Sequence, residues 1–377
     1  MAKKAYIGVD GIARKAKKIY CGVDGVARKV KKAYVGIGGV ARPCFGSGEL
    51  TYYGAITSMD KARGRLAAAT VGNYALFGGG QGDYVNTSYH EFNTVEGYDT
   101  ALTKVSAIDD MTYSVGKLAA ASVGNYAVFA GGNELNNRTS YSGDAYGSSL
   151  TKTTPTILSG AYSEIRGSSV GDYALFAGGI CNGVLRRVVD VVNSSLTQES
   201  SLYLPTKLRS CKSTKTQKHA LFAGGISSSS SAVYQKYVVA FDSSLTRSLP
   251  TDLSDTRCVC GAVTGDYALF INDSSTTVDA YDSALTKTAI DALNAIPVSY
   301  CSGASIGEYA LFVSCACDSV AFDSSLTRTI FEDDQSAIGA IMSYGPTVSA
   351  VLGNYALFTG GDSAATPESA VITYKIS

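Results

Sequence analysis

The chain has 377 residues, with 32 Lys or Arg and 32 Asp or Glu, so its formal net charge is zero. Hydrophobic residues make up 45% and charged residues 17%, a composition that excludes an intrinsically disordered chain. No apolar run is long enough for a transmembrane helix, and no apolar segment follows the basic N-terminus, so we expect neither membrane insertion nor a secretory signal. The 40 glycines and 25 tyrosines favour short strands and tight turns over a helical bundle.

The first segment, residues 1–44, holds three copies of a 14-residue unit. The copies read KKAYIGVDGIARKA, KKIYCGVDGVARKV and KKAYVGIGGVARPC. In each copy an Asp-Gly or Gly-Gly pair separates two short strand-like runs, which is typical of a β-hairpin with a two-residue turn. Because one such hairpin is marginally stable, we expect the three to pack on each other, on identical chains in a homo-oligomer, or on another protein.

Residues 1–44, which we call the arm, contain eleven Lys or Arg and two Asp, a charge of +9 that leaves −9 on residues 45–377. A basic arm can bind the phosphates of nucleic acid. Here, however, the cations recur at fixed places in the repeat, beside Gly and Tyr residues that occupy the same positions in each copy. That arrangement favours docking on an acidic protein surface, or on the acidic remainder of the chain, and nucleic acid is not the expected partner.

A second repeat, with a period of about 47 residues, fills residues 45–377. Its most regular motif is GNYALFGGG, which begins at Gly72 and occurs in seven related copies. The aligned positions are Tyr74, Tyr126, Tyr173, His219, Tyr267, Tyr309 and Tyr355. A second motif, YDTALTK at Tyr98, follows in all copies but the seventh. Each unit predicts four strands, a to d, with a Gly-Asn-like turn between a and b and a Ser-Ser-Leu-like turn between c and d.

The glycine doublet that ends strand b, in a four-stranded unit of this length, resembles the kelch repeat. Tyr or Phe replaces the usual kelch tryptophan, and the fifth and sixth copies lack the doublet. Repeats of this length and strand count predict a β-propeller with one blade per unit. The fold class is therefore all-β: a seven-bladed, kelch-like propeller over residues 45–377, preceded by the β-hairpin arm.

The seventh copy lacks strand d, and a matching segment stands at the start of the propeller. Residues 49–56 (ELTYYGAI) align with residues 101–108 (ALTKVSAI). We therefore expect this N-terminal strand to pair with the strand near Val371 and Tyr374 and to close the ring.

Binding is expected on the face that carries the b–c and d–a connections, because these vary in length while the other turns are uniform. The longest b–c connections are those of blades 1 and 2, and both are rich in Tyr, Asn, Ser and Thr. Such loops on a rigid scaffold are typical of recognition surfaces. The candidate binding residues are Tyr84, Tyr89, His90, Arg138 and Tyr141.

No catalytic residue, metal or cofactor is expected. His219 replaces an aligned tyrosine, and His90 has no identifiable nucleophile or orienting partner. An aspartate recurs at the same turn position of four copies, namely Asp99, Asp242, Asp282 and Asp323. We expect each to cap the backbone of its own turn rather than to act as an acid or base. The nine cysteines include Cys258 and Cys260, whose spacing does not match a zinc knuckle, and we expect free thiols.

The tandem units of the arm resemble those of phage and prophage structural proteins of Gram-positive bacteria. The resemblance covers about 44 residues and implies that the arm is an anchor to virion proteins and the propeller is displayed cargo. The hypothesis is a non-enzymatic, tail-associated or other structural adhesin, located in the virion, that binds a host-surface glycan or protein. The alternative is a bacterial intracellular kelch-type scaffold that binds another protein through the same face. An enzyme, the third class, would need a catalytic cluster that the sequence lacks.

Overall fold

The structure, a computed structural model, describes short stretches of the arm and most of the remaining chain. The described ranges are 6–9, 12–15, 20–23, 26–29, 33–37, 40–45, 48–85, 88–134, 138–141, 143–229, 231–272, 277–290, 301–314, 319–331, 334–339, 348–361 and 368–377.

Three antiparallel hairpins form in the arm, one per repeat unit. They comprise β1 (Tyr6–Val9) with β2 (Ile12–Lys15), β3 (Tyr20–Val23) with β4 (Val26–Lys29), and β5 (Ala33–Ile37) with β6 (Val40–Phe45). In the first hairpin Val9 lies opposite Ile12, so the Asp-Gly pair falls between the strands as the sequence predicts.

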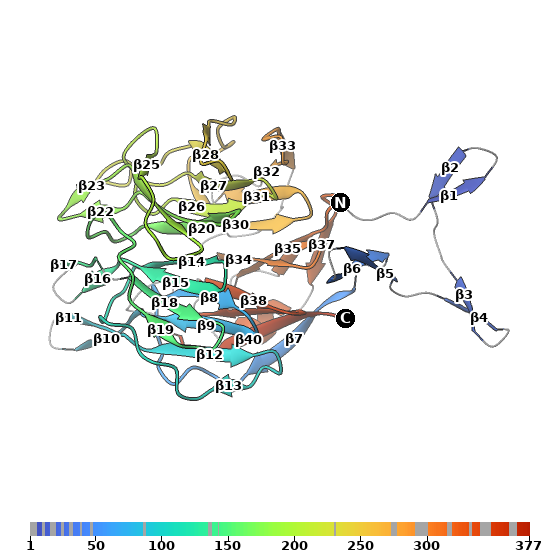
Figure 1. Cartoon of the computed structure of the whole chain (residues 1–377), viewed down its shortest axis with the longest axis horizontal. Coiled ribbons are helices and arrows are strands. Elements are labelled where there is room, and N and C mark those ends of the chain that lie inside the picture. Colours follow the sequence, from blue (N-terminus) through green and yellow to red (C-terminus); the bar gives the residue numbers. More distant parts are fainter. Residues whose placement is uncertain are drawn as a thin grey trace.

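Over the described ranges after the arm, seven four-stranded antiparallel sheets follow one another as the blades of a propeller (Figure 1). Blade 1 consists of β8 (Ala67–Val71), β9 (Tyr74–Gly78), β12 (Val95–Asp99) and β13 (Lys104–Val105). Blade 2 consists of β14 (Ala119–Val123), β15 (Tyr126–Ala130), β18 (Gly143–Gly147) and β19 (Lys152–Thr153). Blade 3 consists of β20 (Arg166–Val170), β21 (Tyr173–Ala177), β24 (Val188–Asn193) and β25 (Leu202–Tyr203).

The remaining blades keep the same order of strands. Blade 4 consists of β26 (Lys212–Lys215), β27 (His219–Ala223), β28 (Val238–Asp242) and β29 (Arg247–Ser248). Blade 5 consists of β30 (Cys258–Thr264), β31 (Tyr267–Asn272), β32 (Val278–Tyr281) and β33 (Lys287–Ile290). Blade 6 consists of β34 (Cys301–Ile306), β35 (Tyr309–Ser314), β36 (Ser319–Phe322) and β37 (Arg328–Phe331). Blade 7 is β38 (Val348–Leu352), β39 (Tyr355–Thr359), β40 (Val371–Ile376) and β7 (Leu50–Ile56). Within the described ranges, the helical content is α1 (Asp334–Gly339), which lies between blades 6 and 7.

Blade 7 is built from both ends of the propeller sequence, which confirms the predicted closure. Strand β7 pairs with β40 in antiparallel register, with Ile56 opposite Val371 and Leu50 opposite Ile376. In Figure 1 the blue β7 runs beside the red C-terminal strand. The seven-bladed propeller predicted from the repeats is therefore the fold of this chain.

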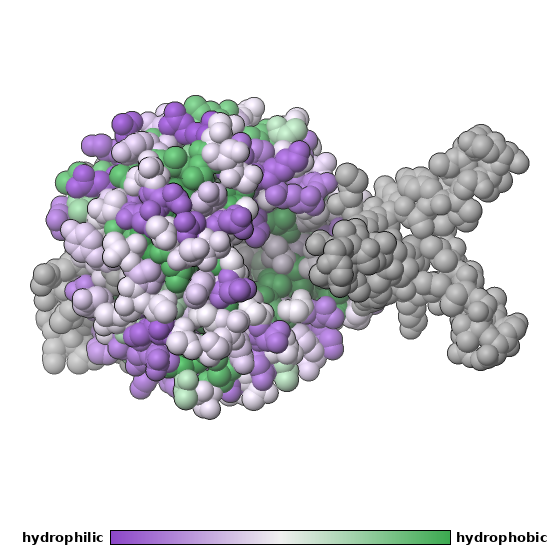
Figure 2. All heavy atoms as spheres, in the orientation of Figure 1, coloured by the Kyte–Doolittle hydropathy of each residue, from purple (hydrophilic) through white to green (hydrophobic). Residues whose placement is uncertain are grey.

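The core consists of apolar layers between neighbouring blades. Successive side chains of a strand point to opposite sides of its sheet. Because each blade packs between two neighbours, both faces of strand b are buried. In blade 1, Leu76 packs in a cluster with Phe129 of blade 2, whereas Phe77 packs in a cluster with Leu357 of blade 7. On the surface, Figure 2 shows hydrophobic residues scattered among hydrophilic ones over the visible face.

Hydroxyl groups join the inner strands of neighbouring blades. Ser122 Oγ donates to the carbonyl of Thr70 at 2.7 Å, and Thr70 Oγ1 donates to the carbonyl of Val351 at 3.0 Å. Ser213 and Ser349 make the same kind of bond between blades 3 and 4 and between blades 6 and 7. These bonds explain why strand a carries Ser and Thr among its small residues.

The glycine doublet allows the end of strand b to approach the next blade closely. Gly131 has a φ of +67°, and a Cβ atom there would collide with the carbonyl of Tyr162. Blades 5 and 6 lack the doublet, and their b strands, β31 and β35, continue for one residue more than strand b of the other blades.

The two kinds of connection lie on opposite faces of the propeller, as the sequence predicts. On one face the a–b turn of a blade packs against the c–d turn of the next, with Gly72 against Ser148. On the other face a d–a connection pairs with the start of a b–c connection; these bridges are Gly64–Gln81, Gly116–Asn133, Ser163–Ile180 and Arg209–Ile226. We call the second face the variable face.

Three b–c connections on the variable face form small hairpins of their own. These are β10 (Gln81–Val85) with β11 (Ser88–Glu91), β16 (Asn133–Glu134) with β17 (Arg138–Thr139), and β22 (Ile180–Cys181) with β23 (Val184–Leu185).

Candidate functional site

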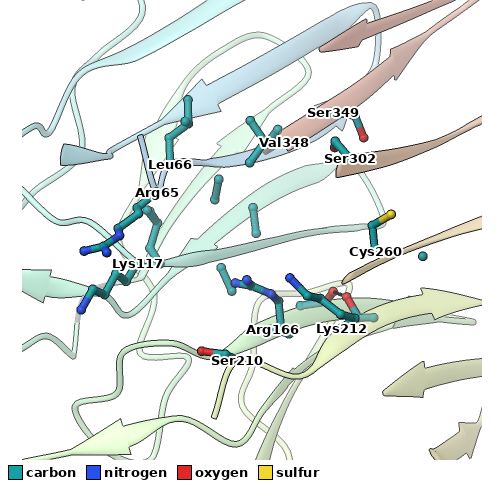
Figure 3. A pocket seen from close by; sticks show the side chains of 18 of the residues that line it. Arg65, Leu66, Lys117, Arg166, Ser210, Lys212, Cys260, Ser302, Val348 and Ser349 are labelled. Atoms are coloured by element: carbon teal, nitrogen blue, oxygen red, sulfur yellow. Dashed lines mark hydrogen bonds between the residues drawn. The ribbon is translucent and has the colours of Figure 1, made fainter. Parts of the chain in front are cut away.

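A cavity of about 720 Å³ lies on the axis of the ring, because the inner strands of all seven blades contribute to its wall (Figure 3). Its lining residues lie where each d–a connection enters strand a. Because the d–a connections lie on the variable face, the cavity lies on that side of the ring. The volume falls within the range of small-molecule binding sites. We call this space the central cavity.

The wall of the central cavity is strongly basic on one side. Among the described residues, its charged lining consists of five cations and one acid, namely Arg65, Lys117, Arg166, Arg209, Lys212 and Glu164. All six belong to blades 1 to 4. Blades 5 to 7 contribute uncharged residues such as Val259, Cys301 and Ser349. This local positive charge contrasts with the net charge of −9 of residues 45–377.

An arc of backbone hydrogen bonds fixes the rim of the cavity in blades 1 to 4. Four residues at the same place in their blades have left-handed backbone conformations, with φ between 53° and 56°: Arg65, Lys117, Glu164 and Ser210. Lys117 N donates to Arg65 O at 2.9 Å, Glu164 N to Lys117 O at 3.0 Å, and Ser210 N to Glu164 O at 2.9 Å. These inter-blade bonds help to offset the cost of each left-handed residue, which is roughly 1–2 kcal/mol.

Glu164 holds together the charged groups at the rim. Its carboxylate accepts hydrogen bonds from Arg209 Nη1 and Ser210 Oγ, both at 2.8 Å, and lies 3.4 Å from Lys117 Nζ. Burial alone would raise the pKa of Glu164, but these hydrogen bonds and the charge of Lys117 outweigh it and lower the pKa below its usual value. Glu164 is therefore a stable carboxylate that binds its neighbours rather than a proton donor.

A chain of polar contacts connects the cavity with the b–c hairpin of blade 1. Arg65 Nη1 donates to Gln81 Oε1 at 3.1 Å, and Gln81 Nε2 donates to Glu91 Oε1 at 3.0 Å. Gln81 and Glu91 face each other across the β10–β11 hairpin. Two buried side chains, Gln81 and Glu91, thus connect the cavity wall to the base of the predicted binding loop.

Arg166 and Lys212 extend into the cavity from neighbouring blades (Figure 3). Burial, and then the charge of Arg166, lowers the pKa of Lys212. These two side chains are cations at a place where the other blades carry uncharged residues.

The predicted binding residues lie in the b–c hairpins of blades 1 and 2. Tyr84 and Tyr89 are register partners in β10–β11, but their side chains, and that of Arg138, are outside the described part of the structure. His90 is exposed, and its ring packs edge-on against Phe92 with centroids 4.9 Å apart. Tyr141 is 70% exposed. Neither His90 nor Tyr141 lines the central cavity.

The recurrent turn aspartates are structural, as predicted. Asp99 Oδ1 accepts the backbone N–H groups of Ala101 and Thr103, both at 2.9 Å. Asp242, Asp282 and Asp323 bind their turns in the same way. His219 is half-buried next to Thr216, and burial lowers its pKa.

Four further acids are buried at equivalent positions of strand c, namely Glu96, Asp144, Asp190 and Asp279. Each carboxylate accepts hydrogen bonds from side chains or backbone groups of its own blade or its connections. Asp144, for example, accepts Thr112 N at 2.9 Å and Thr112 Oγ1 at 2.7 Å. These acids tie connections to blades and leave no free acid–base pair among them.

Two structural searches gave negative results over the described ranges. No group of three or more His, Cys, Asp or Glu side chains there could hold a metal ion. No helix in the same ranges is long and apolar enough to cross a membrane.

The cations of the central cavity did not emerge from the sequence reasoning, although the repeats contain a signal for them. Arg65 and Lys117 directly precede the small-residue run of strand a in the two most similar copies. In the register of strand a, Arg166 and Lys212 stand where those copies have Ala67 and Ala119. A comparison of charge at each position of the repeat would have identified both pairs.

Comparisons with known proteins support the fold. No protein-family model matches the chain, and a search of curated protein sequences found no match. Among solved structures, the one titled "Structure of YjhT" is similar with a TM-score of 0.52 at 10% sequence identity, over 73% of this chain and 99% of that one. At this identity the similarity concerns the fold alone. The chain is thus a seven-bladed β-propeller with an electropositive axial cavity.

Proposed function

We propose that this protein is a non-enzymatic binding propeller that takes its ligand on the variable face. The observation that carries the proposal is the contact chain from Arg65 through Gln81 to Glu91, which joins the basic cavity to the b–c hairpin of blade 1. A concave, charged centre bordered by loops of differing length is typical of recognition sites.

A binding role fits the state of the ionisable groups better than a catalytic one. Glu164, the acid of the cavity wall, is a carboxylate bound by Arg209 and Ser210. The two histidines belong to different blades, and His219 lies in strand b next to Thr216. General acid–base catalysis needs a donor or acceptor with a pKa near the working pH within reach of the substrate. Glu164 and the two histidines do not form such a proton donor and acceptor in one place.

We propose further that the propeller is kelch-like and belongs to a phage or prophage particle, with the arm as anchor to virion proteins. The arm's repeats resemble those of phage structural proteins of Gram-positive bacteria, and its hairpins and its charge of +9 suit docking on an acidic protein surface. In this proposal the propeller is an adhesin that binds a glycan or protein of the host surface, and the protein is located in the virion.

Mass spectrometry of purified phage or induced-prophage particles tests the location. The chain should copurify in a fixed ratio to the other particle proteins, and a variant without residues 1–44 should be lost from particles. A thermal melt of that variant serves as its control, because a folded propeller must be present for the comparison. Normal incorporation of a folded, arm-less variant would overturn the anchor. Recovery only in soluble cytosol, with one captured partner protein, would favour the intracellular scaffold.

Labelled full-length protein tests the adhesin directly. It should bind intact host cells and compete with adsorption of the particles. The same protein with Tyr141→Ala and His90→Ala should bind less if the exposed loop residues contact the receptor. Particle-associated protein that neither binds cells nor competes would refute the adhesin and leave a structural role.

A further inference from the structure

We propose that Arg166 and Lys212 form an oxyanion-binding subsite on the wall of the central cavity, which holds a carboxylate or phosphate group of the ligand. The inference deepens the proposed function and rests on it, because it names the chemistry of what the variable face binds.

The position of the two side chains in the repeat is the first argument. Arg166 lies opposite Ala177 and Lys212 opposite Ala223, so both occupy the same register position of strand a in adjacent blades. The other blades have small or uncharged residues there, namely Ala67, Ala119, Cys260, Ser302 and Val348. The fold itself therefore does not require a cation at this position.

The second argument is that the carboxylate of Glu164, which also lines the cavity, already has its own hydrogen-bonding and charged partners. Glu164 is bound by Arg209, Ser210 and Lys117. Over the described part of the chain, neither Arg166 nor Lys212 forms an ion pair, and Arg166 Nη1 donates only to the carbonyl of Ile165, at 3.3 Å. Two cations are thus available at the cavity wall without a carboxylate between them.

Electrostatics gives the third argument. Two like charges in a half-buried wall repel each other, and burial adds to that cost. Both effects lower the pKa of Lys212. An anion bound between the two side chains would offset the repulsion, since each cation would then face an opposite charge.

The pair also has suitable donor geometry for an oxyanion. A guanidinium presents a planar fork that matches the two oxygens of a carboxylate or phosphate, and an ammonium adds a compact charge with three donors. The cavity of about 720 Å³ is much larger than a single ion. It therefore accommodates a ligand whose acidic group lies at blades 3 and 4 and whose neutral part contacts Ser302, Val348 and Ser349 on the other side.

Calorimetric titration of the full-length protein tests the subsite. The probes are inorganic phosphate, glucuronate and, as the neutral control, glucose. The variants are Arg166→Ala and Lys212→Ala, which restore the residue that blades 1 and 2 carry at this position. Lys236→Ala is the matched control, because Lys236 lies on the variable face but outside the cavity lining.

We expect the wild type to bind glucuronate, phosphate or both, and to bind glucose more weakly. Each alanine variant should weaken anion binding roughly tenfold, or ~1.4 kcal/mol, and the double variant should abolish it. Lys236→Ala should bind like the wild type. Melting temperatures should not fall in the cavity variants, since each loses a repelling charge. If one does fall, Lys212→Gln keeps a polar side chain that is one atom shorter, and it should still lose anion affinity.

The proposal is overturned if the wild type binds neither anion at millimolar concentration, or if the variants bind them as the wild type does. The cell-binding assay separates this from the proposed function. Unchanged anion affinity in variants of a protein that binds host cells refutes the subsite and leaves the adhesin. Anion binding that depends on both cations, in a protein that binds no host surface, supports the subsite and refutes the adhesin.

Discussion

The thiol of Cys260 lies 3.0 Å from the sulfur of Cys301, although the two residues belong to different blades. They come from the inner strands β30 and β34 and line the uncharged side of the central cavity. Both are buried in the core layer between blades 5 and 6. The pair therefore places two thiols in contact across a blade interface, next to the site where we expect the ligand.

Oxidation should link these two thiols. With oxidised glutathione, Cys260 and Cys301 lose two hydrogen atoms in total to form a disulfide, and the oxidant becomes two thiols. Burial, and then the hydrogen bond to Cys301, raises the pKa of Cys260, so the reaction should accelerate as the pH rises. Peptide mapping should find a Cys260–Cys301 cross-link in the folded protein and none in Cys260→Ser. Two free thiols at alkaline pH would contradict the prediction.

Arg63→Met should strongly destabilise the propeller. Arg63 is 0% exposed, its guanidinium lies 2.6 Å from Glu96 Oε2, and it also donates to the carbonyls of Gly79 and Thr94. Loss of one partner of a buried ion pair typically costs ~3–5 kcal/mol. Urea unfolding should show this loss, with Arg247→Ala, at an exposed position, as the unchanged control.

The double variant with Arg63→Met and Glu96→Gln tests the cause of that loss. It should recover part of the stability, since Glu96, which keeps only Lys104 as a charged partner in Arg63→Met, no longer carries a buried charge. A double variant that is as unstable as the sum of the two single changes would show that lost packing, rather than the loss of the Arg63–Glu96 ion pair, dominates.

Stability should depend on Glu164 at acidic pH. Its folded-state pKa is lowered from 4.5, so its ionised form is favoured in the native protein. The stabilisation is present above pH 4.5 and disappears as the pH falls through the lower native pKa. The melting temperature of the wild type should therefore drop faster than that of Glu164→Gln over this acidic range. Parallel curves for the two proteins would contradict the assignment.

Gly131→Ala should destabilise blade 2 against blade 3. The residue has a φ of +67°, and a methyl group would meet the carbonyl of Tyr162. The left-handed conformation alone costs a non-glycine residue ~1–2 kcal/mol, and displacement of the carbonyl adds to this. Gly147→Ala is the control, because the nearest atom to its Cβ would be 3.7 Å away in the ring of Tyr126. Equal melting temperatures for the two variants would refute the role of the doublet.

The propeller itself could be predicted from the sequence because its period is visible in each copy. The recurrence of Tyr74 and its counterparts gave seven units, and the match of residues 49–56 to residues 101–108 gave the closing strand. Both signals are local patterns, and the structure places each where the repeat requires it.

The central cavity could not be predicted in the same way, since it depends on how seven d–a connections converge. Arg166 and Lys212 are far apart along the chain, and only the shared register of β20 and β26 brings them to one wall. The sequence analysis favoured long loops rich in Tyr and Asn, which are recognisable by composition. His90 and Tyr141 are indeed exposed there, but a cation that replaces alanine in a strand is visible only when the repeat copies are compared position by position.

The shared seventh blade also constrains how the protein is made. Thr373 Oγ1 donates to the carbonyl of Gly54 at 2.8 Å, although the two residues are 319 positions apart. During translation, β7 is the first strand of the propeller to leave the ribosome, and it cannot pair with β40 until residues 371–376 have been synthesised. A chain that terminates before β40 therefore leaves an uncovered sheet edge in blade 7.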